Sequence, residues 1–369
     1  MESLVQESKQ PNKTKSYLLM LFALFLFIFS IDLLTVSLSH MNNSVAQDLF
    51  QATRNPFISL FIGLLMTALI QSSSTVTASV VAVVAAGNMS LDQAVPMVMG
   101  ANIGTTLTST LVSFSYIMKK KEFKRALSAG VVHDIFNIMT VLILLPLELN
   151  FRLLSGSAIK LAHFFAPDDN FTGPVVYNKV FTRPFTEWIS DTINIPFVTT
   201  ILAVFIVFAA IKILATSVYK AFVSDSFKEI SNMIFKKTWL SFIYGVFFTA
   251  AVQSSTVTTS LVVPLVATKK VTLKKAFPFI VGANIGTTIT AALAAIYKSE
   301  AAIALAIAHF LFNTIGALII LSFPQLRILP VRLAIYMGKK SVKSRFLGFA
   351  YILLTFFIIP FLLIYFTQD

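Results

Sequence analysis

Long apolar stretches without charge alternate with short polar or basic segments along the 369-residue chain. Several stretches reach about 20 residues, the length that an α-helix needs to cross a hydrocarbon core about 30 Å thick. The pattern therefore predicts an all-α polytopic membrane protein. The first stretch exceeds the apolar core of a signal peptide, so we expect it to remain as a transmembrane helix. The predicted full crossings are 17–38, 96–118, 126–147, 195–215, 276–296, 301–322 and 347–366.

Two further apolar stretches are interrupted by a polar run at their centre. Residues 71–75 (Gln-Ser-Ser-Ser-Thr) divide 56–86, and residues 253–256 (Gln-Ser-Ser-Thr) divide 238–268. An unsatisfied polar group inside a bilayer costs several kcal/mol, and arms of roughly 12 to 15 residues are too short for a full crossing. Each stretch is therefore predicted to form a re-entrant helical hairpin whose polar turn lines a cavity.

The hairpins belong to an internal repeat. The sequence Gly-Ala-Asn-Ile-Gly-Thr-Thr at 100–106 recurs identically at 282–288, with the same offset of 182 residues that relates the two polar runs. An internal repeat in a membrane chain is typical of secondary transporters. We expect the chain to divide into an N-terminus with the first helix (1–55), repeat 1 (56–147), a linking region with a long extracellular loop (148–237), repeat 2 (238–323) and a basic segment with the last helix (324–369).

Charge predicts the orientation of the repeats. If each hairpin enters and leaves on one face, the basic segments 119–125, 218–237, 269–275 and 324–345 all lie on the same side as the N-terminus. The positive-inside rule makes that side cytoplasmic in a cell (inner) membrane. The first hairpin then opens outward and the second inward, so the repeats are inverted. Because an odd number of full crossings, seven, is predicted, a cytoplasmic N-terminus also puts the C-terminus outside.

Composition excludes several classes of protein. The chain is 56% hydrophobic and 12% charged, with a mean hydropathy of +0.82, which excludes an ordinary soluble domain. The net charge of +13 is explained by basic cytoplasmic loops facing the lipid bilayer, so we expect no nucleic-acid partner. Cysteine is absent, which excludes disulfides and cysteine-based metal sites, and we expect no transition metal.

The predicted site contains no fixed charge. Asp, Glu, Lys and Arg are absent from 57–86, 96–118, 238–268 and 277–297. If the second arms begin at Val76 and Val257, their N-terminal amides form a cradle for an anion, and hydroxyl oxygens suit a small hard cation. We also expect Gly104 and Gly286 to interrupt their helices. An anion bound without cationic side chains requires co-bound cations, so the residues predict a cation-coupled anion transporter.

These motifs, together with Gly-Asn-Met-Ser at 87–90 and Val-His-Asp-x-Phe-Asn at 132–137, resemble the type II sodium-dependent inorganic phosphate cotransporter family, in a bacterial-type member. The resemblance implies sodium-driven symport of inorganic phosphate, with sodium ions as coupling ions, no other cofactor and no enzymatic activity. Because the chain ends soon after its last helix, we expect it to lack the soluble C-terminal domain of some bacterial relatives. The resemblance places substrate and sodium at Gln71, Ser72, Ser73, Ser74, Thr75, Asn102, Thr105, Thr106, Gln253, Ser254, Ser255, Thr256, Asn284, Thr287 and Thr288.

Several alternatives remain open at the level of sequence. His133 and Asn137 lie one helical turn apart, as do His309 and Asn313, and they suit either a hydrogen-bonded brace between repeats or a proton relay. A transporter of another oxyanion or small carboxylate, driven by sodium or protons, would share the architecture. A channel or an intramembrane hydrolase fits the repeated turns less well. A homo-oligomer is compatible with the architecture, and Asp32 in the first helix is left without a role.

Overall fold

The computed structural model describes residues 13–41, 51–165, 182–218, 234–296 and 299–366, and within them the chain is helical and contains no strands. The N-terminal helices are α1 (Lys13–Ser39), α3 (Pro56–Ile70), α4 (Ser73–Ala85), α5 (Leu91–Gly104), α6 (Leu107–Ser113), η1 (Phe114–Tyr116), α7 (Lys120–Phe151) and α8 (Leu153–Phe165). The remaining helices are α10 (Arg183–Ile193), α11 (Pro196–Val218), α13 (Thr238–Val252), α14 (Ser255–Ala267), α15 (Leu273–Ala295), α16 (Glu300–Ser322), α17 (Pro324–Lys343), α18 (Arg345–Leu353), η4 (Leu354–Ile358) and α19 (Ile359–Phe366).

Six helical spans among the described residues are long and apolar enough to cross a membrane. They are α1, α7, α11, α15, α16 and the continuous C-terminal span α18–η4–α19. The chain is thus an all-α polytopic membrane protein, as the sequence predicts. The predicted crossing at 96–118 is wrong as a single helix, because the chain divides there into α5 and α6.

Two other boundaries differ from expectation. The basic segment at 119–125, predicted as a loop, already belongs to α7 from Lys120 onward. Lys, Glu and Arg all have high helix propensity, so this charged segment can continue a helix. Its positive charge bears on the side of the membrane and does not mark the end of the helix. Most of the basic segment predicted at 218–237 lies outside the described residues, whereas the one at 324–345 forms α17.

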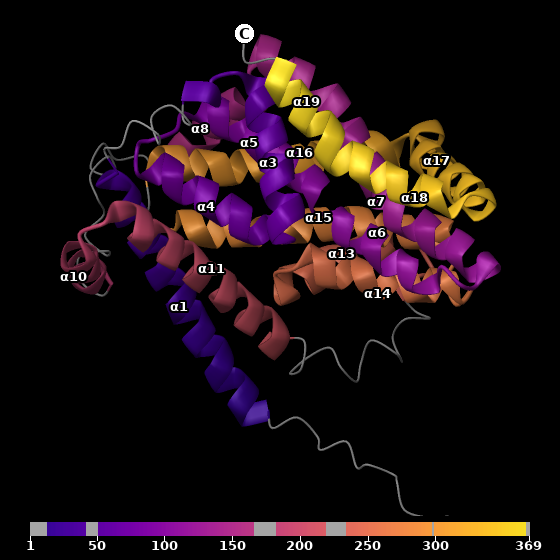
Figure 1. Ribbon diagram of the computed structural model, residues 1–369, viewed down its shortest axis with the longest axis horizontal. Coiled ribbons are helices and arrows are strands. Elements are labelled where there is room, and N and C mark those ends of the chain that lie inside the picture. The colour runs from indigo at the N-terminus through magenta and orange to yellow at the C-terminus, as the bar shows by residue number, and fades with distance from the viewer. Residues whose placement is uncertain (1–12, 42–50, 166–181, 219–233, 297–298, 367–369) are drawn as a thin grey trace, which may run out of the picture.

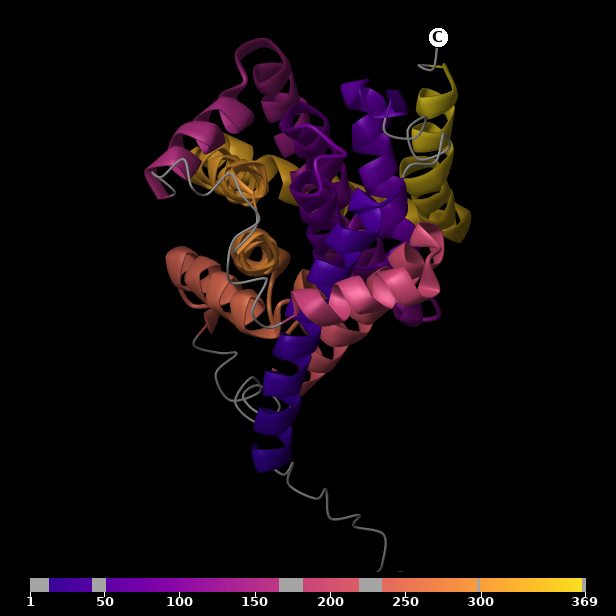
Figure 2. The same cartoon turned by 90° about the vertical axis from the view of Figure 1, so that its left-hand side faces the viewer.

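The repeated sequences adopt the same elements. The pair α3–α4 and the pair α13–α14 each consist of a helix of 15 residues, a turn that begins with Gln, and a helix of 13 residues. In each copy the first arm packs along the helix that follows the hairpin, α3 along α5 and α13 along α15. Figures 1 and 2 show α1 and α11 side by side in the lower part of the molecule.

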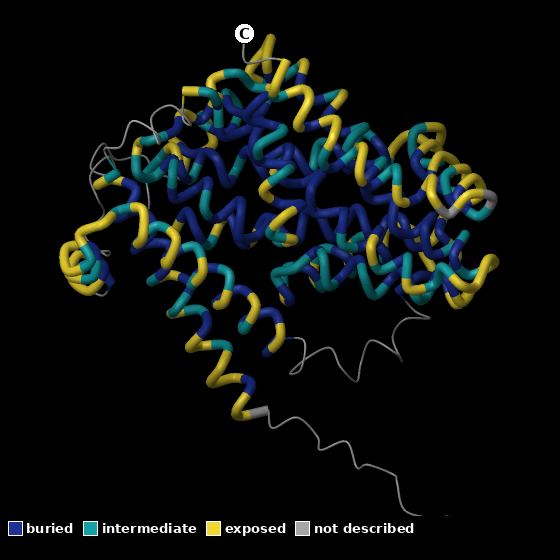
Figure 3. The backbone as a smooth tube through the Cα atoms, in the orientation of Figure 1, coloured by how far each residue is buried: buried dark blue, intermediate teal, exposed yellow. Residues whose placement is uncertain are grey.

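Glycines allow the close packing of these helix pairs. A Cβ atom on Gly63 of α3 or Gly100 of α5 would overlap a backbone carbonyl of the facing helix. Gly245 of α13 and Gly282 of α15 are in the same situation in the second copy. The glycine motifs therefore bring backbones together, as small residues do between membrane helices. Figure 3 shows that buried residues run through the centre of the molecule, with exposed ones on α10 and α17.

The expectation that both repeated glycines interrupt their helices is half right. The helix α5 ends at Gly104, whereas α15 continues unbroken through Gly286. After Gly104 the hydroxyl of Thr106 donates to the carboxylate of Asp134, 3.1 Å away. The second copy has Phe310 at the position of Asp134, and the hydroxyl of the corresponding Thr288 donates to the carbonyl of Ile285 in its own helix.

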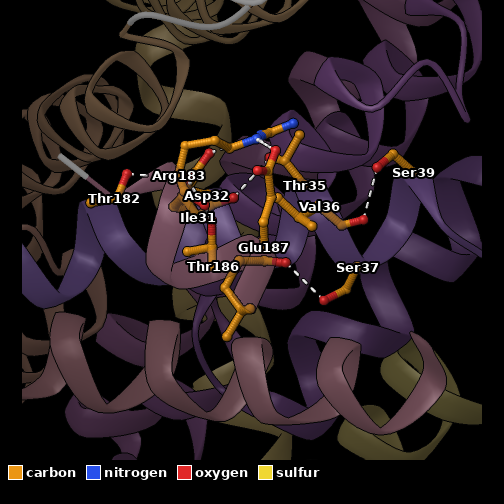
Figure 4. A network of polar contacts seen from close by, with 11 residues as sticks. Ile31, Asp32, Thr35, Val36, Ser37, Ser39, Thr182, Arg183, Thr186 and Glu187 are labelled. Carbon is orange, nitrogen blue, oxygen red and sulfur yellow. Dashed lines mark hydrogen bonds and ion pairs between the residues drawn. The ribbon is translucent and has the colours of Figure 1, made fainter. Parts of the chain in front are cut away.

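The buried acid of the first helix, Asp32, is held by α10. Its carboxylate accepts hydrogen bonds from the hydroxyls of Thr182 (3.1 Å) and Thr186 (2.9 Å), and Arg183 donates to it from 3.2 Å (Figure 4). Buried charges are tolerated when they are paired and hydrogen-bonded in this way. Asp32 therefore fixes α10 against α1.

Candidate functional site

The two polar runs form turns with the same backbone geometry. Gln71 and Gln253 end their helices in the left-handed region, with φ of 57° and 54°. Their N–H groups donate to the carbonyls of Thr67 and Thr249 at 2.7 Å and 2.6 Å. Glycine usually takes this left-handed position after a helix. A glutamine there adds backbone strain, but it places an amide side chain at the turn.

The second arms begin earlier than expected. They start at Ser73 and Ser255, not at Val76 and Val257. The preceding serines, Ser72 and Ser254, cap them, because their hydroxyls accept from backbone N–H groups three residues ahead at 3.2 Å and 3.3 Å. The N-termini of both helices therefore lie within the polar runs themselves.

The hydroxyls of the turns are used differently. Ser74 donates to the backbone carbonyl of Gln253, 3.0 Å away, so the two turns touch. Thr75 is hydrogen-bonded to Ser72 at 2.8 Å. Among the described residues, the hydroxyls of Ser73 and Ser255 have no hydrogen-bond partner, and both side chains are buried. The turns thus present a pair of equivalent uncommitted hydroxyls.

A single cavity joins the two turns. Its volume is about 390 Å³, and Gln71, Ser72, Ser254 and Thr256 line it together with residues of α11. The side-chain oxygen of Gln253 is buried nearby without a hydrogen-bond partner in the described part of the chain. Polar side chains from both repeats therefore line one cavity.

The predicted amide and histidine residues form a network that crosses between the repeats. His133 Nε2 lies 2.5 Å from the side-chain oxygen of Asn284, and the amide of Asn284 donates to Asn137 at 2.5 Å. Asn137 in turn donates to the backbone carbonyl of Asn102 at 2.6 Å. Reciprocally, His309 Nε2 lies 3.5 Å from the side-chain oxygen of Asn102. Each histidine thus faces the asparagine of the other repeat.

The side chains of Asn313 and of three motif threonines form hydrogen bonds to the backbone of their own helices. Asn313 donates to the carbonyl of His309 at 3.1 Å, one turn back on the same helix. The hydroxyls of Thr105, Thr287 and Thr288 also donate to carbonyls of their own helices. Thr288 lines a separate apolar cavity between α13, α15 and α16. The structure therefore does not bring these threonines into the cavity at the turns.

The comparisons with known proteins bear on this geometry. The chain matches the family model described as Na+/Pi-cotransporter over residues 26–145 and 205–359. The chain belongs to this family. The matched ranges include both turns and the asparagine–histidine network, and they leave out α10.

Curated members of the cotransporter family resemble the chain over most of its length. Sodium-dependent phosphate transport protein 2A of Ovis aries is 31% identical over 428 residues, which cover 93% of this chain and 66% of the relative. The corresponding protein of Rattus norvegicus is 30% identical with the same coverage. Protein 2B of Homo sapiens is 28% identical, with 93% and 64% covered. The chain spans about two thirds of the length of these relatives. No solved structure matches it.

A buried acid in the cotransporter fold has contacts that sequence reasoning did not find. Asp134 accepts hydrogen bonds from Thr106 and from the hydroxyl of Tyr351, which belongs to α18. The side chain is fully buried. The signal in the sequence was an acidic residue inside an apolar stretch, next to His133, in one copy of the repeat and not in the other. Its partner Tyr351 could not be found from the sequence, because it lies outside the repeat.

Proposed function

We propose that the protein is a secondary active transporter that couples sodium to the symport of inorganic phosphate into the cell. The observation that carries the proposal is the single cavity lined by both Gln-Ser-Ser turns. The family membership and the relatives named as sodium-dependent phosphate transport proteins supply the substrate and the coupling ion.

The turns provide the two kinds of group that such a transporter needs. The first N–H groups of α4 and α14 face the turns and carry partial positive charge, which favours an anion. The uncommitted hydroxyls of Ser73 and Ser255 donate to phosphate oxygens. Oxygen acceptors such as the side chain of Gln253 suit sodium, and sodium bound beside phosphate offsets its charge.

Alternating access follows from the proposed topology. The N-terminus is cytoplasmic, the first hairpin is re-entrant from the outside, and the second is re-entrant from the cytoplasm. The two turns then meet near the middle of the membrane, and the hydrogen bond from Ser74 to Gln253 joins them. Inverted repeats that meet in this way are common in secondary transporters.

Uptake of radiolabelled phosphate into proteoliposomes tests the function. An inward sodium gradient is expected to raise internal phosphate above the external level, whereas potassium at equal ionic strength is not. A pH gradient alone identifies proton coupling. If no gradient moves phosphate through folded protein, the assigned substrate is wrong, and sulfate, arsenate and small carboxylates are assayed in its place.

Single cysteines test the topology, because the native chain has none to interfere. Asn88→Cys, between the first hairpin and α5, is expected to react with an impermeant thiol reagent from outside intact cells. Lys270→Cys, between the second hairpin and α15, is expected to react only after the cells are opened. Labelling of both from the same side contradicts inverted hairpins.

A further inference from the structure

The cavity between the two turns has a charged residue in its wall. Lys212 of α11 lines it together with Phe208 and Thr216, opposite Gln71, Ser72 and Ser254. The hairpins at 57–86 and 238–268 and the motif segments at 96–118 and 277–297 hold no lysine or arginine. Lys212 therefore brings the one cationic side chain that lines this cavity in the described part of the chain.

Lys212 has no acidic partner in the part of the chain that the structure describes. Within the described residues it forms no ion pair and no hydrogen bond from its side chain, and the side chain is not buried by protein. A cation within an apolar helix is expensive unless something compensates its charge, so such residues mark functional sites. The lining of this cavity includes no acid that could do so.

The side chain is directed along α11 away from the near end of the helix. Its ammonium group lies 5.9 Å from the centre of the Phe208 ring, one turn toward the helix N-terminus. The nearer end of α11 is Val218. A lysine that only reached for the closer membrane surface would point toward that end. The ammonium group instead lies beside Phe208, which lines the same cavity.

Packing of α11 against the second turn fixes this placement. Leu214 and Ala215 follow Lys212 on α11. They form one apolar cluster with Val252, and Val257 packs against this cluster. Those two valines flank the polar run at 253–256. The helix that bears Lys212 is thus held directly against the residues that present Ser254 and Thr256 to the cavity.

We propose that Lys212 is a phosphate-binding residue of the transport site, and that its ammonium group contacts an oxygen of the anion held between the two turns. This inference rests on the proposed function. Lysine serves as a point charge toward phosphate, with three donors on a flexible stem. It also revises the expectation of a site without fixed positive charge, since α11 contributes the charge that both hairpins lack.

The kinetic test compares three substitutions in the proteoliposome assay. Lys212→Met removes the charge at nearly constant length and is expected to raise the KM for phosphate about tenfold or more, the loss typical of one hydrogen bond to a charged group. Lys212→Arg keeps the charge and is expected to stay within about threefold of the wild type. Lys160→Met makes the same change on α8, away from the cavity, and is expected to leave KM unchanged.

A chemical test separates charge from packing. Lys212→Cys is the single cysteine of its chain. Reaction with aminoethyl methanethiosulfonate restores a side chain of lysine-like length and charge, and is expected to restore phosphate affinity. The negatively charged sulfonatoethyl reagent is expected to lower it further. Saturating phosphate in the presence of sodium is expected to slow the labelling of this cysteine.

The outcomes distinguish the two proposals. If the wild type accumulates phosphate, but Lys212→Met keeps its KM and phosphate does not protect the cysteine, then the inference about Lys212 is overturned and the transport function stands. If the wild type moves no phosphate, the proposed function fails and the inference fails with it.

Discussion

Ser73→Ala and Ser255→Ala are each expected to reduce sodium-driven phosphate uptake by tenfold or more. Both side chains are buried at the start of a second hairpin arm, and neither hydroxyl is committed to another group in the described structure. A hydrogen bond to a charged ligand contributes roughly 1.5–3 kcal/mol, which corresponds to about 10- to 150-fold in affinity. The measurement is initial uptake in proteoliposomes over a range of phosphate concentrations.

Controls on the same helices separate a site effect from a folding effect. Ser79→Ala on α4 removes only a hydrogen bond to the helix's own backbone, and Ser260→Ala on α14 removes a half-buried hydroxyl more than one turn after Ser255. Both are expected to retain uptake. Full uptake by Ser73→Ala and Ser255→Ala together would mean that the turns do not bind the substrate.

The hairpins could be predicted from the sequence because their signal is local. A polar run without charge at the centre of an apolar stretch has few structural solutions, and the stretches at 56–86 and 238–268 do contain two helices and a turn each. The repeat added a second independent example of the same pattern. The family was recognised from those same motifs.

Boundaries were harder, because serine and threonine can either cap a helix or continue it. The prediction that the second arms begin at Val76 and Val257 assumed that every serine and threonine of the polar runs belongs to the turn. Within the two polar runs, only Gln71 and Gln253 have positive φ, and Ser72 and Ser254 act as caps. The unequal fates of Gly104 and Gly286 could not be predicted from the sequence, because the two glycines lie in identical motifs.

The features that sequence reasoning missed all depend on contacts between distant segments. Lys212 carries no motif and belongs to no repeat, and it matters only because α11 packs against the second turn. Asp32 could not be explained without α10, whose Arg183 lies 151 residues further along the chain. Such contacts are set by tertiary packing, which a single sequence does not encode as a local pattern.

The network between the repeats carries the other large expected effect. Asn284→Ala is expected to lower the melting temperature of the purified protein by several degrees and to abolish uptake. The substitution leaves two buried atoms, Nε2 of His133 and the side-chain oxygen of Asn137, without the hydrogen bonds that Asn284 makes to them, at a cost of roughly 1–3 kcal/mol for each group. Asn150→Ala, which loses only an exposed bond to its own helix, is the matched control and is expected to keep the wild-type melting temperature.

The direction of the hydrogen bonds favours a brace over a proton relay. Because the amide nitrogen of Asn284 donates to Asn137, the amide oxygen of Asn284 is free to accept a hydrogen bond from His133 Nε2. Glutamine can donate in the same way but cannot take part in proton transfer. His133→Gln is therefore expected to keep most of the sodium-driven uptake and the wild-type dependence on pH. Loss of uptake by a variant that keeps the wild-type melting temperature would instead identify His133 as a proton carrier.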